Sequence, residues 1–287
     1  MSGLRTGRSR PLSCRTRPPA PPRAGARMSD ALVRRFRDVL PPDLDFCSMR
    51  LVDQSSSAVV LQRGVLQPVH ETEDRGVMVT VRHGAGLGYA GTADLSASGL
   101  AAAIARARAW AEATAARVVF NYSRVALPEP TGSWESPVEL PWSDLSLSDR
   151  IGLVHAAAAG IPADDRISHW EVMLQRLRVE TRLVTSHGGD ARQVFDMLSP
   201  DAMVVANADG QTQVRSLGLR GATHQGGLEI LERVGFAGAP QRLATEALQL
   251  LDAPDCPTGT MDVLLAPDQM MLQIHESIGH PIELDRI

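Results

Sequence analysis

Apolar residues recur at helical spacing in five parts of the chain, and each part is predicted to form a helix. Ser29 or Asp30 can cap the first of these helices, and Pro41 stops it. Its apolar face carries Leu32, Val33, Phe36 and Leu40. The other predicted helices are an Ala-rich one over 92–116 that can open at Thr92, Asp94 or Ser96, one from Ser146 or Ser148 to about 160, one over 241–251, and one from 267 to about 279.

Between these helices, short apolar runs bounded by turn residues predict β-strands. The predicted strands cover 45–52, 58–63, 77–82, 87–90 and 259–265, and an antiparallel meander covers 167–218 with turns at 186–190, near Pro200 and at 207–210. The stretch His83-Gly84-Ala85-Gly86 is typical of a hairpin turn. The predicted fold class is α+β: antiparallel strands with flanking helices come first, and an antiparallel β meander and a last helix follow.

Proline and charge divide the chain into four predicted regions. Residues 1–27 are rich in Arg, Pro and Ser, so they are expected to be a disordered leader, with Met28 as the true start. An organellar transit peptide is the alternative, but the prolines over 18–22 would break the amphipathic helix that such leaders use. Residues 28–125 are predicted to form an N-terminal α+β region, 126–146 a Pro-rich linker, and 147–287 a second α+β region.

The charge balance argues against a nucleic-acid partner. All 29 basic residues are Arg, and seven of them lie in residues 1–27, which hold no acidic residue. Residues 28–287 therefore carry 22 Arg against 33 acidic residues, a net charge of −11, and an acidic body repels a polyanion. No apolar run reaches the roughly 18 residues that a membrane-spanning helix needs. We expect a protein that binds neither nucleic acid nor membrane.

The cysteines indicate a reducing compartment. Cys14, Cys47 and Cys256 are few, odd in number and far apart, so they form neither a disulfide framework nor a CxxC metal site. A cytoplasmic location fits this usage best.

The chemistry of the chain is concentrated in His275-Glu276-Ser277-Ile278-Gly279-His280, an HExxxH motif. Neutral imidazole is a preferred ligand of zinc, and a carboxylate next to it can act as general base on zinc-bound water. Five residues of α-helix turn through about 140° beyond a full turn, which is too far for two ligands of one metal. We therefore expect His280, which precedes Pro281, to leave the helix end and turn back. Met271, Ile274 and Ile278 are expected to pack inward.

Three stretches of the sequence, one of which contains this motif, resemble the TldD/PmbA metallopeptidase family, in its TldD-type branch. They are HESIGHPIELDRI, the preceding VLLAPDQMMLQI, and GVMVTVRHGAGLGYAGTADLS nearer the N-terminus. The resemblance implies a cytoplasmic Zn²⁺-dependent peptidase that acts on peptides or unfolded segments. It also implies pairing with a PmbA/TldE-like subunit or a homo-oligomer. By this resemblance His275 and His280 are zinc ligands and Glu276 is the catalytic acid/base.

The family's third zinc ligand is a cysteine in a C-terminal β-rich domain, and this sequence has no cysteine after Cys256. Three hypotheses therefore stay open: the N-terminal part of a truncated or split peptidase, a catalytically silent partner-binding module, or a gene remnant. Glu283 and Asp285 are candidates to orient the imidazoles. His187, in a Ser-His-Gly-Gly-Asp stretch, is expected to be a turn residue.

Overall fold

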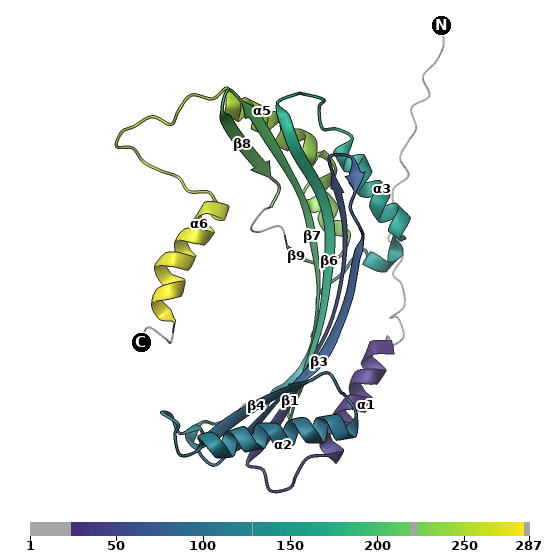
Figure 1. The fold of residues 1–287 in the computed structure, drawn as a ribbon, viewed down its shortest axis with the longest axis vertical. Coiled ribbons are helices and arrows are strands. Elements are labelled where there is room, and N and C mark those ends of the chain that lie inside the picture. The colour runs from purple at the N-terminus through teal and green to yellow at the C-terminus, as the bar shows by residue number, and fades with distance from the viewer. Residues whose placement is uncertain (1–23, 128, 219–222, 284–287) are drawn as a thin grey trace. The chain divides into compact units, whose positions relative to one another are not determined.

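The computed structural model describes residues 24–127, 129–218 and 223–283, and it has the predicted α+β fold (Figure 1). One sheet has the strand order β4-β3-β1-β6-β7-β5, with β2 on β1 and with β8 and β9 on β7. The long strands are β1 (Phe46–Gln62), β3 (His70–His83), β6 (Ile167–Thr185) and β7 (Asp190–Ala208). The short ones are β2 (Val65–Leu66), β4 (Gly86–Thr92), β5 (Thr131–Glu135), β8 (Gln211–Ser216) and β9 (His224–Gln225).

Six α-helices accompany the described strands. They are α1 (Ala24–Asp38), α2 (Ala97–Thr114), α3 (Leu147–Ala158), α4 (Glu229–Arg233), α5 (Ala239–Leu251) and α6 (Pro267–Ile274). Short 3₁₀ turns are η1 (Tyr122–Arg124), η2 (Trp142–Asp144), η3 (Phe236–Gly238) and η5 (His280–Ile282), and η4 (His275–Gly279) is a π-helical turn. Among the residues that the structure describes, no helix combines the length and the apolar character that crossing a membrane requires.

The chain forms two compact units, each built from three separate stretches of sequence. Unit 1 comprises Met1–Arg50, Gly76–Pro130 and Arg182–Asp190, and unit 2 comprises Leu51–Arg75, Thr131–Thr181 and Ala191–Ile287. The long strands are shared between the units, so neither unit is a continuous piece of chain. The domain boundaries predicted near 125 and 146 stay a prediction.

In unit 1, helix α2 lies very close to the edge strand β4. A Cβ atom at Gly88 would lie 2.0 Å from the carbonyl oxygen of Ala107, and one at Gly86 would lie 1.9 Å from that of Ala111. Only glycine allows this approach, so the Gly-rich β4 sequence sets the distance between helix and strand. The predicted hairpin is confirmed, since His83 pairs with Gly86 across the turn. Fully buried residues of this core include Phe36, Cys47, Met49, Val79, Val81, Leu100 and Ile104.

In unit 2, helices α3, α4 and α5 cover a second apolar core. Its members include Val59, Leu61, Val172, Leu174, Leu198, Ile230 and Leu243. Of the two predicted N-caps of α3, Ser146 is the one used, and with Asp149 it forms a capping box. Of the three cap candidates before α2, Ser96 is used, and its side chain accepts from the Gly99 N–H.

Charged residues line part of the same sheet face in unit 2, next to the apolar core. Arg192 donates from Nε and Nη2 to the carboxylate of Glu180 at 2.9 and 3.0 Å. These hydrogen bonds raise the pKa of the Arg192 guanidinium, against the effect of burial. Asp196 accepts from both Arg176 and Arg178. Because each of these charged side chains has an ion-pair partner of opposite charge, the strands remain continuous along this polar stretch.

This polar stretch explains why the prediction of two separate strands over 45–63 is wrong. β1 is continuous, and its serines make side-chain hydrogen bonds: Ser55 accepts from Arg176, and Ser57 donates to Glu71. The turn predicted near Pro200 is also wrong. Pro200 lies within β7, between the residues that pair with β9 and those that pair with β8. Its missing N–H therefore costs no hydrogen bond of the β7–β8 or β7–β9 ladder.

Two further predictions need correction. Helix α1 begins at Ala24, so Ser29 lies inside it, where its hydroxyl accepts from Arg182 at 3.0 Å. The strand predicted over 259–265 does not form: Val263 and Leu264 are 73% and 99% exposed, and a strand without a partner has no ladder to stabilise it. Of the expected disordered leader over 1–27, residues 1–23 lie outside the described part of the chain, and residues 24–27 are not disordered but belong to α1.

Candidate metal centre

Helix α6 brings the HExxxH motif to its C-terminal end. Pro267 occupies the first turn, where its missing N–H costs no hydrogen bond and its fixed φ suits a helix. Regular α-helix continues to Ile274. From this point the helix changes its hydrogen bonding, at the position where the first histidine of the motif stands.

A π-helical turn over His275–Gly279 aligns the two histidines. The N–H of His280 donates to the carbonyl of His275, an i→i+5 bond in place of the α-helical i→i+4 bond. The wider turn places residues five apart on one side of the helix, which an α-helix cannot do. The two imidazole ring centroids are 4.4 Å apart, with the rings at 72° to each other.

This geometry corrects the expected path of His280. The residue keeps right-handed helical dihedrals, with φ −62° and ψ −39°, although it precedes Pro281. The expectation that it leaves the helix is therefore wrong. The helix widens before His280, and a 3₁₀ turn begins at it. The preference of a residue before proline for extended backbone is outweighed here by the hydrogen bonds of the two turns on either side.

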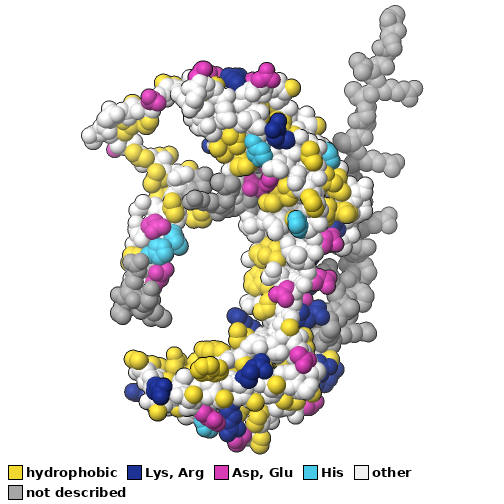
Figure 2. All heavy atoms as spheres, viewed as in Figure 1, with side chains coloured by type: hydrophobic (Ala, Val, Ile, Leu, Met, Phe, Trp, Pro, Cys, Tyr) yellow, Lys and Arg dark blue, Asp and Glu magenta, His cyan; other side chains and the backbone are white. Residues whose placement is uncertain are grey.

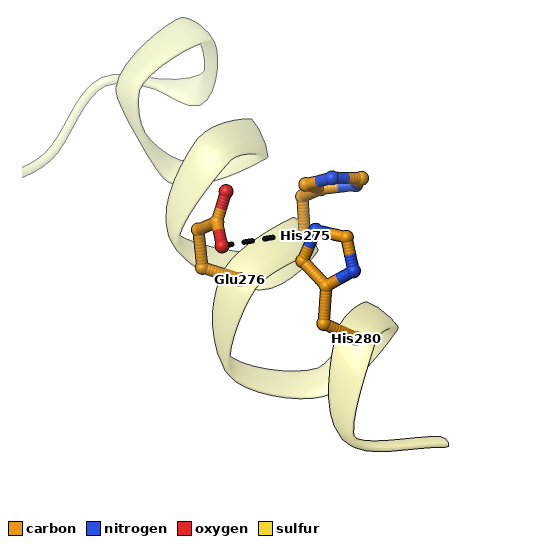
Figure 3. A group of neighbouring side chains, drawn as sticks. All are labelled: His275, Glu276 and His280. Carbon is orange, nitrogen blue, oxygen red and sulfur yellow. Dashed lines mark ion pairs between the residues drawn. The ribbon is translucent and has the colours of Figure 1, made fainter. Parts of the chain in front are cut away.

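His275, Glu276 and His280 form a cluster whose potential ligand atoms all lie within 4.8 Å of one another. Nε2 of His280 lies 3.8 Å from Oε2 of Glu276 (Figure 3). His275 and Glu276 are exposed and His280 is half-buried, so a metal ion and a substrate can reach all three. Two imidazoles and a carboxylate fit a zinc ion or another borderline divalent metal ion.

Glu283 contacts the second histidine from the other side of its ring. Oε1 of Glu283 lies 2.8 Å from Nδ1 of His280. Of the two acidic residues expected to orient the imidazoles, Glu283 thus makes such a contact, and Asp285 lies outside the described residues.

Comparison with known proteins relates one part of the chain to a metallopeptidase family. Residues 47–111, from β1 to α2, match the sequence model of PmbA/TldA metallopeptidase domain 1. A 62-residue stretch is 39% identical to a protein named metalloprotease from Methanothermobacter thermautotrophicus. The stretch makes up 22% of this chain and 14% of that protein. Residues 47–111 therefore resemble the first domain of this metallopeptidase family. The matched residues 47–111 do not include the HExxxH motif.

Solved structures share the fold of this chain. A proposed modulator of a DNA gyrase from Thermotoga maritima has a TM-score of 0.60 at 15% identity, over 82% of this chain and 50% of its own. A proposed modulator of DNA gyrase from Bacteroides thetaiotaomicron scores 0.51 at 16% identity, over 66% and 44%. TldE from Thermococcus kodakarensis scores 0.50 at 11% identity, over 78% and 47%. The chain spans about half the length of these structures or less.

The apolar side chains around the motif are exposed. Met271, Ile274 and Ile278, which were expected to pack inward, are 50%, 50% and 57% exposed. Figure 2 shows histidine and acidic side chains on the surface of the same helical segment, with hydrophobic side chains beside them. Periodicity predicted that these residues share a face, but the surface that would cover the face is not among the described residues of the chain.

The remaining candidates are not members of the cluster. His187 lies in the turn between β6 and β7, as predicted, where its ring is 5.7 Å from that of Phe46 and its Nδ1 is 4.0 Å from Glu129. Cys256 is exposed and is not part of the cluster. Cys47 is buried in unit 1, and its burial raises the pKa of the thiol to about 12, so it is a core residue.

Proposed function

We propose that this chain carries the zinc-binding element of a TldD-type metallopeptidase, with His275 and His280 as two ligands and Glu276 as general base. The observation that supports the proposal most is the π-helical turn. It brings the two imidazoles of an otherwise misaligned motif together, with the Glu276 carboxylate beside them. Such a helical irregularity is costly without a function, and π-turns are frequent at functional sites.

The chemistry follows from the positions of these side chains. Zinc, when bound, lowers the pKa of a water ligand and polarises a peptide carbonyl. The Glu276 carboxylate accepts a proton from the attacking water and delivers it to the departing amine nitrogen. The exposed position of the cluster suits an extended or unfolded peptide as substrate. A third protein ligand from outside the cluster is needed to complete a catalytic zinc site.

The exposed apolar face of α6 supports the proposed partner. A catalytic zinc site works in a water-poor surrounding, so we propose that a PmbA/TldE-like subunit or a second copy of the chain helps to cover this face. We also propose a cytoplasmic location, because both described cysteines, Cys47 and Cys256, are free thiols.

Zinc binding by the purified chain tests the metal site. In competition with a chromophoric chelator, the wild type should bind one zinc ion. His275→Ala and His280→Ala should each weaken binding on the order of 100-fold, because each removes a ligand. His70→Ala is the matched control, since His70 is exposed and distant in sequence from the motif. Equal zinc affinity in all four proteins would reject the site.

Hydrolysis of an unfolded reporter peptide tests the base. Glu276→Gln should keep zinc and lose zinc-dependent cleavage, since the amide cannot accept the proton.

The alternative, a catalytically silent partner-binding module, draws support from the same exposed α6 face. A wild-type chain that binds a partner or peptide, yet neither holds zinc nor cleaves the reporter, would favour that alternative. Zinc-dependent cleavage by the chain alone would exclude it.

A further inference from the structure

Two consecutive helical irregularities, not one, shape the end of the HExxxH motif. The π-turn aligns His275 with His280, and the 3₁₀ turn η5 then aligns His280 with Glu283. A 3₁₀-helix has three residues per turn, so side chains three apart lie on the same side. Pro281 fixes the dihedral φ at the second position of this turn, and the Glu283 N–H donates to the His280 carbonyl at 3.3 Å. The backbone thus holds the Glu283 carboxylate beside the His280 ring.

The contact selects one tautomer of His280. A carboxylate can only accept, so the 2.8 Å contact requires the proton on Nδ1 of His280. In a neutral imidazole, Nε2 is then the nitrogen with the free lone pair. This is the same nitrogen that faces the Glu276 carboxylate at 3.8 Å. The free lone pair is therefore on the ring nitrogen that lies nearer to the Glu276 carboxylate.

A direct metal-binding role for Glu283 fits the geometry less well. The group of potential ligand atoms that lie within 4.8 Å of one another consists of His275, Glu276 and His280, and Glu283 is not in it. Glu283 touches Nδ1, and Glu276 approaches Nε2, so the two carboxylates address different nitrogens of one ring.

We infer that Glu283 is a positioning residue of the metal centre, which holds His280 as its Nδ1–H tautomer and presents Nε2 to the metal. The inference rests on the proposed function for its metal, but the tautomer itself exists without zinc. A carboxylate that accepts from the outer nitrogen of a metal-ligating histidine fixes the ring and raises its basicity as a ligand. In this chain the sequence Glu-Ser-Ile-Gly-His-Pro-Ile-Glu supplies both the base and this orienting carboxylate.

Nitrogen NMR on the metal-free chain with ¹⁵N-labelled histidine tests the tautomer at pH 8, where an ordinary imidazole is neutral. The His280 signals are identified by their loss in His280→Ala. The wild type should show a protonated Nδ1. Glu283→Ala should shift His280 toward the Nε2–H form, and Glu283→Gln should restore most of the Nδ1–H form, because its amide oxygen also accepts. Glu232→Ala, an exposed glutamate on α4, is the control. An Nε2–H tautomer in the wild type, or no shift in Glu283→Ala, would overturn the inference.

Zinc affinity tests whether the Nδ1–H tautomer of His280 strengthens metal binding. Glu283→Ala should weaken zinc binding about 10- to 100-fold, and Glu283→Gln by much less. A tautomer shift without any loss of zinc affinity would overturn the positioning role. If the wild type bound no zinc at all, the proposed function would fail, and the NMR result would still decide whether Glu283 fixes the His280 ring.

Discussion

The buried thiol of Cys47 makes the stability of this protein depend on pH in the alkaline range. Cys47 is fully buried in the core of unit 1, and desolvation raises its pKa from 9.0 to about 12. The raised value means that the folded state holds the thiol proton where the unfolded state has released it. The stability contributed by the neutral thiol is therefore complete below pH 9 and is lost as the pH rises from 9 toward 12.

The size of the loss follows from the shift. Each pH unit above the unfolded pKa costs about 1.4 kcal/mol of unfolding free energy, so raising the pH from 9 to 10.5 should cost roughly 2 kcal/mol. The chain has no lysine, so besides the chain terminus only three cysteines and two tyrosines titrate in this range. Tyr89 and Tyr122 are 55% and 36% exposed. The alkaline loss should therefore come mainly from Cys47.

Urea unfolding under reducing conditions at pH 8, 9, 10 and 10.5 measures this loss. At pH 8, Cys47→Ala should be less stable than the wild type by about 1–2 kcal/mol, because it loses buried volume. The difference should shrink as the pH rises and vanish near pH 10.5. Cys256→Ala, at an exposed site, is the control and should track the wild type at every pH. A difference between Cys47→Ala and the wild type that stays constant from pH 8 to 10.5 would refute the reasoning.

Three further predictions concern the scaffold, and urea denaturation measures each. Gly88→Ala should lower the free energy of unfolding by about 2–3 kcal/mol, because its Cβ would lie 2.0 Å from a backbone oxygen. Gly91→Ala in the same strand, where the nearest atom to a Cβ would be 3.9 Å away, should change the stability little. Equal effects of the two substitutions would contradict the close packing of α2 on β4. Glu180→Ala should lower the free energy of unfolding by about 2–3 kcal/mol, since Arg192 would then keep the exposed Glu135 as its ion-pair partner. An unchanged stability would mean that the Glu180–Arg192 pair does not stabilise the fold. Ser146→Ala should cost about 1 kcal/mol through loss of the α3 cap, and an unchanged midpoint would exclude that cap.

Local signals in the sequence predicted much of the fold. Ser146 and Ser96 were among the expected caps, and the hairpin at Gly84 follows from its turn residues. The errors arise where tertiary contacts decide. The predicted strands leave a gap over 53–57, yet Ser55 and Ser57 in that gap lie within β1, where they form hydrogen bonds with Arg176 and Glu71. No local pattern reveals those partners, which lie up to 121 residues away.

The opposite error occurred over 259–265. The apolar run has the composition of a strand, but a strand also needs a neighbour, and composition does not supply one. The same holds for Met271 and Ile278 on the helix that follows: their spacing defines a face, and burial depends on a second surface. Sequence periodicity therefore predicts which side chains lie together more reliably than it predicts what covers them.

The metal centre shows how spacing can be interpreted more fully. The prediction that a five-residue interval does not suit a regular α-helix is confirmed. The prediction that His280, which precedes Pro281, leaves the helix end is wrong. Gly279 and His280 instead keep right-handed helical dihedrals, so the helix absorbs the extra residue as one π-turn. The 3₁₀ turn that begins at His280 and contains Pro281 then brings Glu283 to the second histidine. In this chain the HExxxH motif and the Pro281 and Glu283 that follow it thus form one wide turn and then one tight turn, and each turn aligns one pair of side chains around the His280 imidazole.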